Sequence, residues 1–453
     1  MKRNSIIILP GIYLSIVFFI FNFINEYIFL GLIFLIILYA FFVAIKYLVL
    51  LPFCIYPFLF LIKNEANQNL IIAVLPELII IFSSIIFILY KKIITSNITL
   101  FSLIILHSLI TILIGFFHMH EFSSLPILFR QFFIPLFFMI IFIYASEKNN
   151  TLPKEAIRIS ILSFGIITIL ALLNYYDVIY LYKYMTPAGS YVGRPFFGCT
   201  NDIIAPFIHC VTIGEYSNQM VRMELFLGGS IGSAGSLLML LALVTIILNN
   251  KSYKFLKYFS LTFITCAVLS MSISIIIPIF FFIMVKIVTK KNYLILIPFS
   301  FIIMLLITIK TSFFGTLSPF EYFNLTIFSG VSNYFSEINI LNLLFGSGPV
   351  ITSNRFVFLP DRSLLDIGIF RIFSETGILN FILFFSILVH LFKKLLWLQI
   401  HHYSYYSASL FVIFCSLLTM IHGNMVIFPP FYPLFIAVTA GILTEHKLKE
   451  SII

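Results

Sequence analysis

The stretch from Leu343 to Leu379 gathers charged residues in a chain of which only 10% is charged. It opens on the Gly346-Ser-Gly-Pro349 turn and ends in an apolar run. Between them stand three arginines and three carboxylates: Arg355, Arg362, Arg371, Asp361, Asp366 and Glu375. An arginine fork binds phosphate or carboxylate through two hydrogen bonds, and a carboxylate can take a proton from a hydroxyl group. Such groups at a membrane surface are costly unless they serve a function. We therefore expect this stretch to bind an anionic ligand and to carry out catalysis.

Arg371 and Glu375 are four residues apart, so they share one face of a helix. The sequence predicts one continuous helix over residues 367–392, about 39 Å long at 1.5 Å per residue. The hydrocarbon core of a bilayer is only about 30 Å thick, so the first two turns of this helix can stand above it. Arg371 and Glu375 would then lie beside Asp366, either as a ligand site or as a structural ion pair.

The composition predicts an all-α, polytopic membrane protein. The chain of 453 residues is 61% hydrophobic with a mean hydropathy of +1.12, and a spanning helix needs about 20 apolar residues. The continuous runs exclude the alternating strands of a barrel. We expect a single integral membrane domain over residues 1–453, with 12–14 spans. The candidate runs are 5–24, 28–45, 47–62, 70–90, 98–117, 126–145, 156–173, 226–248, 255–271, 272–289, 292–309, 367–392, 404–423 and 427–444.

The lysines predict how the chain is oriented. If the N-terminus is cytoplasmic, sixteen of the nineteen lysines fall on the cytoplasmic side, as the positive-inside rule requires. Both termini would then be cytoplasmic. The net charge of +10 is explained by this topology and needs no nucleic-acid partner.

The arginines show the opposite distribution. Six of the eight fall outside or at the outer end of a span: Arg130, Arg194, Arg222, Arg355, Arg362 and Arg371. Each alone could pair with a loop carboxylate, but as a set they favour an anionic ligand at the outer face. We assign all six to substrate binding, and Asp366 and Glu375 to catalysis.

Two long connections are expected on the outer side, residues 174–225 and residues 310–366. Loops of this length are usually functional or disordered, and these two keep aromatic and apolar residues. Arg222 leads into a run with Gly228, Gly232 and Gly235, a spacing that lets helices pack closely. His107 lies within a span, where a hydrogen bond between helices is its commoner role. We expect no metal site, and no nucleotide motif is present, so the substrate must already be activated.

This layout resembles the bacterial O-antigen and capsular polysaccharide polymerases, in the superfamily that includes the O-antigen ligases. The resemblance is carried by the two arginine-rich outer loops and by Asp366-x-Gly368-x-x-Arg371-x-x-x-Glu375-x-Gly377 after a Gly-Ser-Gly turn. The small-residue run after Arg222 and Ser270-Met-Ser272 also resemble family segments. The specific likeness covers the C-terminal half, and the remainder matches in topology alone.

The resemblance implies inverting glycosyl transfer on the periplasmic side of the bacterial inner membrane, with a glycan on undecaprenyl diphosphate as donor and the next lipid-linked repeat unit as acceptor. It implies no cofactor, and it names a chain-length regulator and a flippase as partners. Ligases of the superfamily place a histidine where Asp366 stands, which favours a polymerase. A ligase and a flippase for the same lipid-linked oligosaccharide are the alternatives.

Overall fold

The computed structural model describes residues 49–55, 98–119, 134–175, 195–198, 210–211, 219–221, 231–247, 256–269, 338–346, 368–401 and 432–450, with residues 81, 85, 275, 278–279, 282 and 335–336 besides. Its helices are α3 Leu51–Ile55, α6 Ile98–Met119, α8 Ile134–Lys148, α9 Leu152–Tyr175, α11 Ile231–Ile247, α12 Leu256–Leu269, α17 Ile340–Phe345, α18 Gly368–His401 and α20 Tyr432–Glu450. Three short strands complete the description: β1 Pro195–Gly198, β2 Cys210–Val211 and β3 Gln219–Val221.

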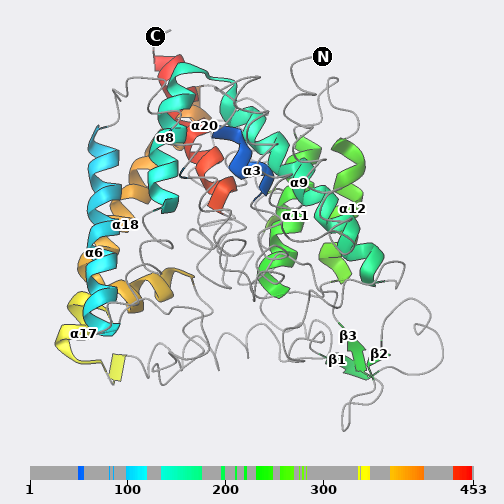
Figure 1. Cartoon of the computed structure of the whole chain (residues 1–453), viewed down its shortest axis with the longest axis horizontal. Helices are drawn as coiled ribbons and strands as arrows, with labels where there is room; N and C mark the ends of the chain where they lie inside the picture. The colour runs from blue at the N-terminus through cyan, green and yellow to red at the C-terminus, as the bar shows by residue number, and fades with distance from the viewer. Residues whose placement is uncertain are drawn as a thin grey trace.

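The helices form a bundle whose long members run roughly side by side (Figure 1). Apolar chain that leaves water must satisfy its backbone hydrogen bonds internally, and the continuous Leu, Ile and Phe runs do so as helices. Helix α20 packs against α8, α9 and α18, and α9 also packs against α12. Phe53 of α3 contacts Phe138 and Phe142 of α8, with ring centroids 5.7 and 4.7 Å apart. All three rings are fully buried.

Two described stretches are long and apolar enough to cross a membrane, by length and composition: Leu152–Leu173 and Gly377–Leu398, each of 22 residues. Their mean hydropathies are 2.3 and 1.9. The helical class is therefore confirmed for the described part of the bundle. Most of the other expected spans lie partly or wholly outside the described residues. Within α6, the apolar stretch is shorter, only Ile105–Ile114. The number of spans therefore stays a prediction.

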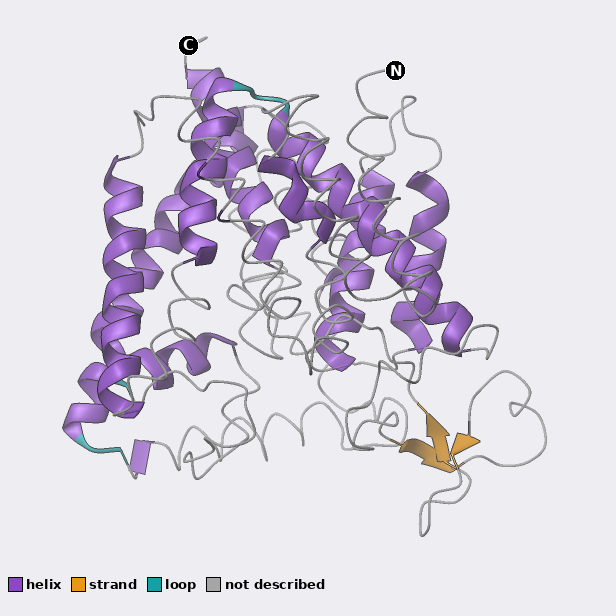
Figure 2. Ribbon diagram, in the orientation of Figure 1, coloured by secondary structure: helices purple, strands orange, loops and turns teal. Residues whose placement is uncertain are grey.

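The strands form a small sheet within the first long connection, a feature that the sequence did not predict. Their order is β1-β3-β2, and both pairings are antiparallel. The sheet lies beyond the helices at one end of the bundle (Figure 2). It belongs to the connection between α9 and α11 and leaves the helical bundle itself unchanged.

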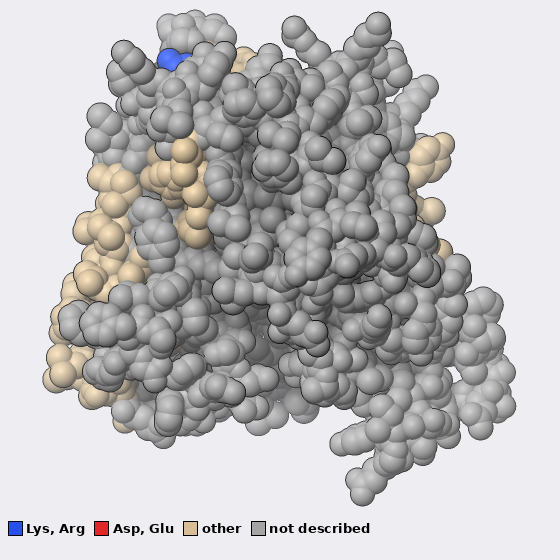
Figure 3. Space-filling view, viewed as in Figure 1, with Lys and Arg blue, Asp and Glu red and all other residues tan. Residues whose placement is uncertain are grey.

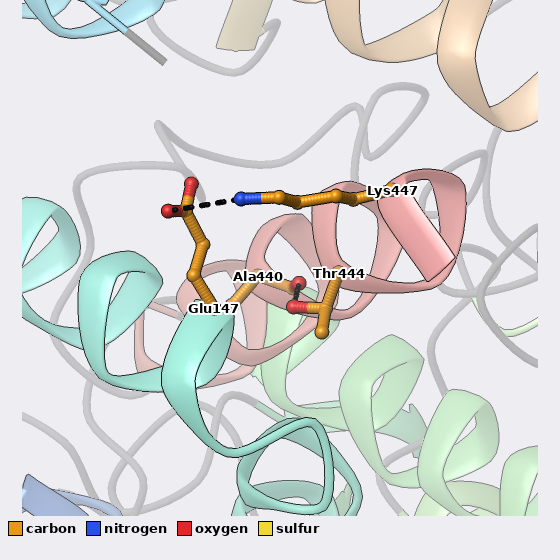
Figure 4. A network of polar contacts seen from close by, with 4 residues as sticks. All are labelled: Glu147, Ala440, Thr444 and Lys447. Carbon is orange, nitrogen blue, oxygen red and sulfur yellow. Dashed lines mark hydrogen bonds and ion pairs between the residues drawn. The ribbon is translucent and has the colours of Figure 1, made fainter. Parts of the chain in front are cut away.

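The C-terminal ends of three helices meet at the opposite end. The Lys447 ammonium of α20 lies 3.7 Å from a carboxylate oxygen of Glu147 in α8 (Figure 4). The same figure shows the Thr444 hydroxyl donating to the Ala440 carbonyl within α20. The Trp397 ring of α18 lies 4.6 Å from the His446 ring of α20, between centroids. Because α9 begins directly after α8, its first turn lies at this end too.

Candidate functional site

Helix α18 carries Arg371 and Glu375, and it is broken at Gly377. The backbone there has φ 73° and ψ 172°, which is not helical. The expected continuous helix is therefore wrong at this residue, because a conformation open essentially to glycine alone interrupts it. Figure 1 shows the first part of α18 running across the end of the bundle and the longer part rising beside α6. We call this break the elbow and residues 368–376 the arm.

Helix α17 fits against the elbow. Its N-cap Asn339 accepts a hydrogen bond from the amide of Asn342 at 2.6 Å, and it ends at Gly346, where φ is 81°. The Gly346 amide donates to the Asn342 carbonyl at 2.8 Å. A Cβ on Gly377 would lie 2.5 Å from the Gly346 nitrogen and would overlap the Leu344 carbonyl oxygen. The backbones of α17 and α18 thus meet at Gly377, where a side chain has no room, and the two ends of the charged stretch come together.

A row of aromatic rings crosses the elbow. Phe373 of the arm lies 6.0 Å from Phe335 and 5.6 Å from Phe381, between ring centroids. Phe381 in turn stacks on Phe385 at 6.2 Å. Aromatic pairs of this kind contribute about 0.5–1.5 kcal/mol each beyond their buried area. The row therefore ties the arm to the segment before α17 and to the long part of α18.

A buried polar network joins α18 to α6 directly after the elbow. Thr111 donates its hydroxyl proton to the His107 carbonyl at 2.8 Å, so its oxygen accepts from the Asn380 amide nitrogen at 2.6 Å. That leaves the Asn380 carbonyl oxygen to accept from His107 Nδ1 at 2.7 Å. The exposed fractions of these three side chains are 6% or less. The interpretation of His107 as a hydrogen bonder between helices is confirmed, whereas its partner Asn380 was missed.

Two more of the predicted arginines are next in sequence to the ends of strands in the sheet. Pro195 pairs with Val221, so the start of β1 and the end of β3 lie side by side. Arg194 precedes the first of these residues and Arg222 follows the second. The two arginines themselves lie outside the described residues, and the structure fixes only the strand ends next to them.

The remaining predicted site residues are placed in part or not at all. The structure describes the backbones of Arg371 and Glu375 on the arm, one helical turn apart, but not their side chains. Outside the described residues lie Arg130, Arg194, Arg222, Arg355, Arg362 and Asp366. Of the proposed constellation, the structure thus places the arm and the strand ends beside Arg194 and Arg222.

Three lysines and the arm lie at opposite ends of the bundle. Lys148, Lys154 and Lys447 belong to the end where α8, α9 and α20 meet, and basic atoms appear there in Figure 3. The arm, α17 and the sheet lie at the opposite end (Figure 2). The arm therefore lies at the end of the bundle away from these three lysines.

Comparison of the chain with protein-family models, with curated proteins and with solved structures gives no match, so the case for a function rests on the residues and on the geometry above.

Proposed function

We propose that this protein is a polysaccharide polymerase of the O-antigen type. It would join repeat units carried on undecaprenyl diphosphate by inverting glycosyl transfer at the periplasmic side of the bacterial inner membrane. Both termini would be cytoplasmic, because the lysine-rich end of the bundle is the end that the positive-inside rule keeps inside.

The observation that carries the proposal is the elbow at Gly377. It turns the arm out of the direction of the spanning helix, across the end of the bundle opposite the lysines (Figure 1). A substrate whose lipid tail lies in the bilayer presents its diphosphate at that depth. Arg371 and Glu375, one turn apart on the arm, would therefore stand where a lipid diphosphate and a sugar hydroxyl can both reach them.

The residue types suit this transfer. The bond between C1 of the donor sugar and the diphosphate oxygen breaks, and a bond between C1 and the acceptor hydroxyl oxygen forms with inversion. The electron pair leaves on undecaprenyl diphosphate, so negative charge grows on its oxygens, which arginines stabilise most in the transition state. The acceptor proton passes to a carboxylate, Asp366 or Glu375. Because the donor is already activated, the reaction needs no nucleotide.

The test is a gel of surface and lipid-linked polysaccharide from a strain that lacks the gene. A polymerase predicts that the surface ladder collapses to a single repeat unit and returns when the gene is restored. Long polymer that stays on the carrier lipid would indicate a ligase instead. Single units held on the cytoplasmic face would indicate a flippase, and either of these results would refute the proposal.

A further inference from the structure

We propose that His107 and Asn380 are positioning residues, which hold the elbow at one place on α6 and thereby fix the arm that carries Arg371. This inference deepens the proposed function and depends on it for its effect on catalysis. Neither residue would touch the substrate. Their effect would pass through the backbone of α18.

The elbow is held from two directions. On one side the backbone of α17 packs against Gly377, where no Cβ has room. On the other side Asn380 bonds to α6, and it follows Gly377 by only three residues, about 4.5 Å along a helix. A rotation or slide of α18 at this level would therefore move the elbow, the arm and α17 together.

The contact between α6 and α18 is directional, which distinguishes it from the apolar packing around it. An asparagine side chain in an apolar helix is costly unless its donor and its acceptor are both satisfied. Here Asn380 uses both, on Thr111 and on His107, which are one turn apart on α6. Only one register and one rotation of the two helices satisfies these bonds, as a buried asparagine fixes the register of a coiled coil.

An aromatic ring of α18 packs against the His107 ring of this network. Phe384 lies one turn beyond Asn380 on α18, is 6% exposed, and its ring centroid is 5.6 Å from that of His107. Water therefore has little access to the two hydrogen bonds, which keeps them from exchanging for bonds to solvent. The network suits a fixed joint better than a sliding contact.

The experiment compares three single substitutions in full-length protein reconstituted in lipid nanodiscs. Asn380→Ala removes both bonds between the helices, and Thr111→Val removes one of them while keeping the side-chain shape. Ser386→Ala is the matched control, because the Ser386 hydroxyl is also on α18 but donates to the Ile382 carbonyl of its own helix at 2.8 Å.

The first readout is the distance between nitroxide labels on α6 and α17. They are introduced as unnatural amino acids at Leu113 and Leu341, which are 53% and 67% exposed. A positioning role predicts a narrow distribution of distances in the wild type and in Ser386→Ala. It predicts a broad or shifted distribution in Asn380→Ala, with Thr111→Val in between. An unchanged distribution in both network variants would overturn the inference, and Thr111→Val decides the matter if Asn380→Ala does not fold.

The second readout is the rate of glycan elongation at saturating lipid-linked repeat unit. A misplacement of about 1 Å can slow a reaction about 100-fold, so Asn380→Ala should lower this rate by about that factor with an unchanged KM. A broadened distance with an unchanged saturated rate would contradict positioning. If the wild type itself elongates nothing, the proposed function fails at that step, and the distance measurement alone then decides whether the network holds the elbow.

Discussion

Replacing Gly377 with alanine tests the elbow itself. Its φ of 73° and ψ of 172° lie in a region that only glycine occupies readily, which costs other residues about 1–3 kcal/mol. The new Cβ would also lie 2.5 Å from the Gly346 nitrogen, and relieving such overpacking costs about 1–3 kcal/mol more. Together the backbone cost and the overpacking cost destabilise the folded elbow by about 2–6 kcal/mol. The contact between α17 and α18 should therefore separate before the rest of the bundle unfolds.

Hydrogen exchange of the protein in nanodiscs measures this opening. The Gly346 amide, which donates to the Asn342 carbonyl at 2.8 Å, should exchange at least about 30-fold faster in Gly377→Ala, since each 1.4 kcal/mol is a factor of ten. Exchange in α9 and α20 should stay as in the wild type.

Gly165→Ala is the matched control for this prediction. An alanine Cβ at that position also overlaps a neighbour, because it would lie 2.6 Å from Cε1 of Phe259. That neighbour is a side chain which can move, and alanine gains about 1 kcal/mol over glycine within a helix. The net cost should be at most about 2 kcal/mol, with no effect on Gly346. Wild-type exchange at Gly346 in Gly377→Ala would refute the packing described for the elbow.

Three further predictions concern Arg371, the ion pair between Glu147 and Lys447, and the orientation of the chain in the membrane. Arg371→Ala should slow polymer formation in membranes about 100- to 1,000-fold at a normal protein level, and Arg371→Lys should recover only part because an ammonium lacks the planar fork; full activity in either would remove Arg371 from the site. Glu147→Gln should lower the free energy of unfolding in micelles by about 1 kcal/mol, since its partner Lys447 is 56% exposed, and the loss should be smaller in a background carrying Lys447→Met. A cysteine introduced at Leu341 should react with a membrane-impermeant reagent added to intact spheroplasts, and one at Asn150 only after lysis; the reverse pattern would invert the orientation.

The sequence predicted the described helices well where they are long and apolar. The run at residues 98–117 is α6, Ile98–Met119, and the run at 156–173 lies within α9, Leu152–Tyr175. Helix α9 begins earlier than predicted because Pro153 is tolerated in its first turn, where its missing amide has no helical partner to lose. Continuous apolar length is a local property, so it can be recognised in one sequence.

The features that shape the candidate site depend on distant partners. Gly377 is one glycine in an apolar run, and its conformation follows from the backbone of α17, about thirty residues earlier. His107 and Asn380 are 273 residues apart, and each looks like an isolated polar residue until the fold brings them together. The strands have only two to four residues, too few for an alternating pattern to be visible.

The most direct test of the central claim is elongation by the purified protein alone. Reconstituted in liposomes with undecaprenyl-diphosphate-linked repeat units, the wild type should produce a ladder of longer glycans on the carrier and release one undecaprenyl diphosphate for each unit joined. Arg371→Ala, purified and reconstituted in the same way, should elongate about 100- to 1,000-fold more slowly. A wild type that leaves the single units unchanged, or a ladder of equal length from Arg371→Ala, would contradict the account.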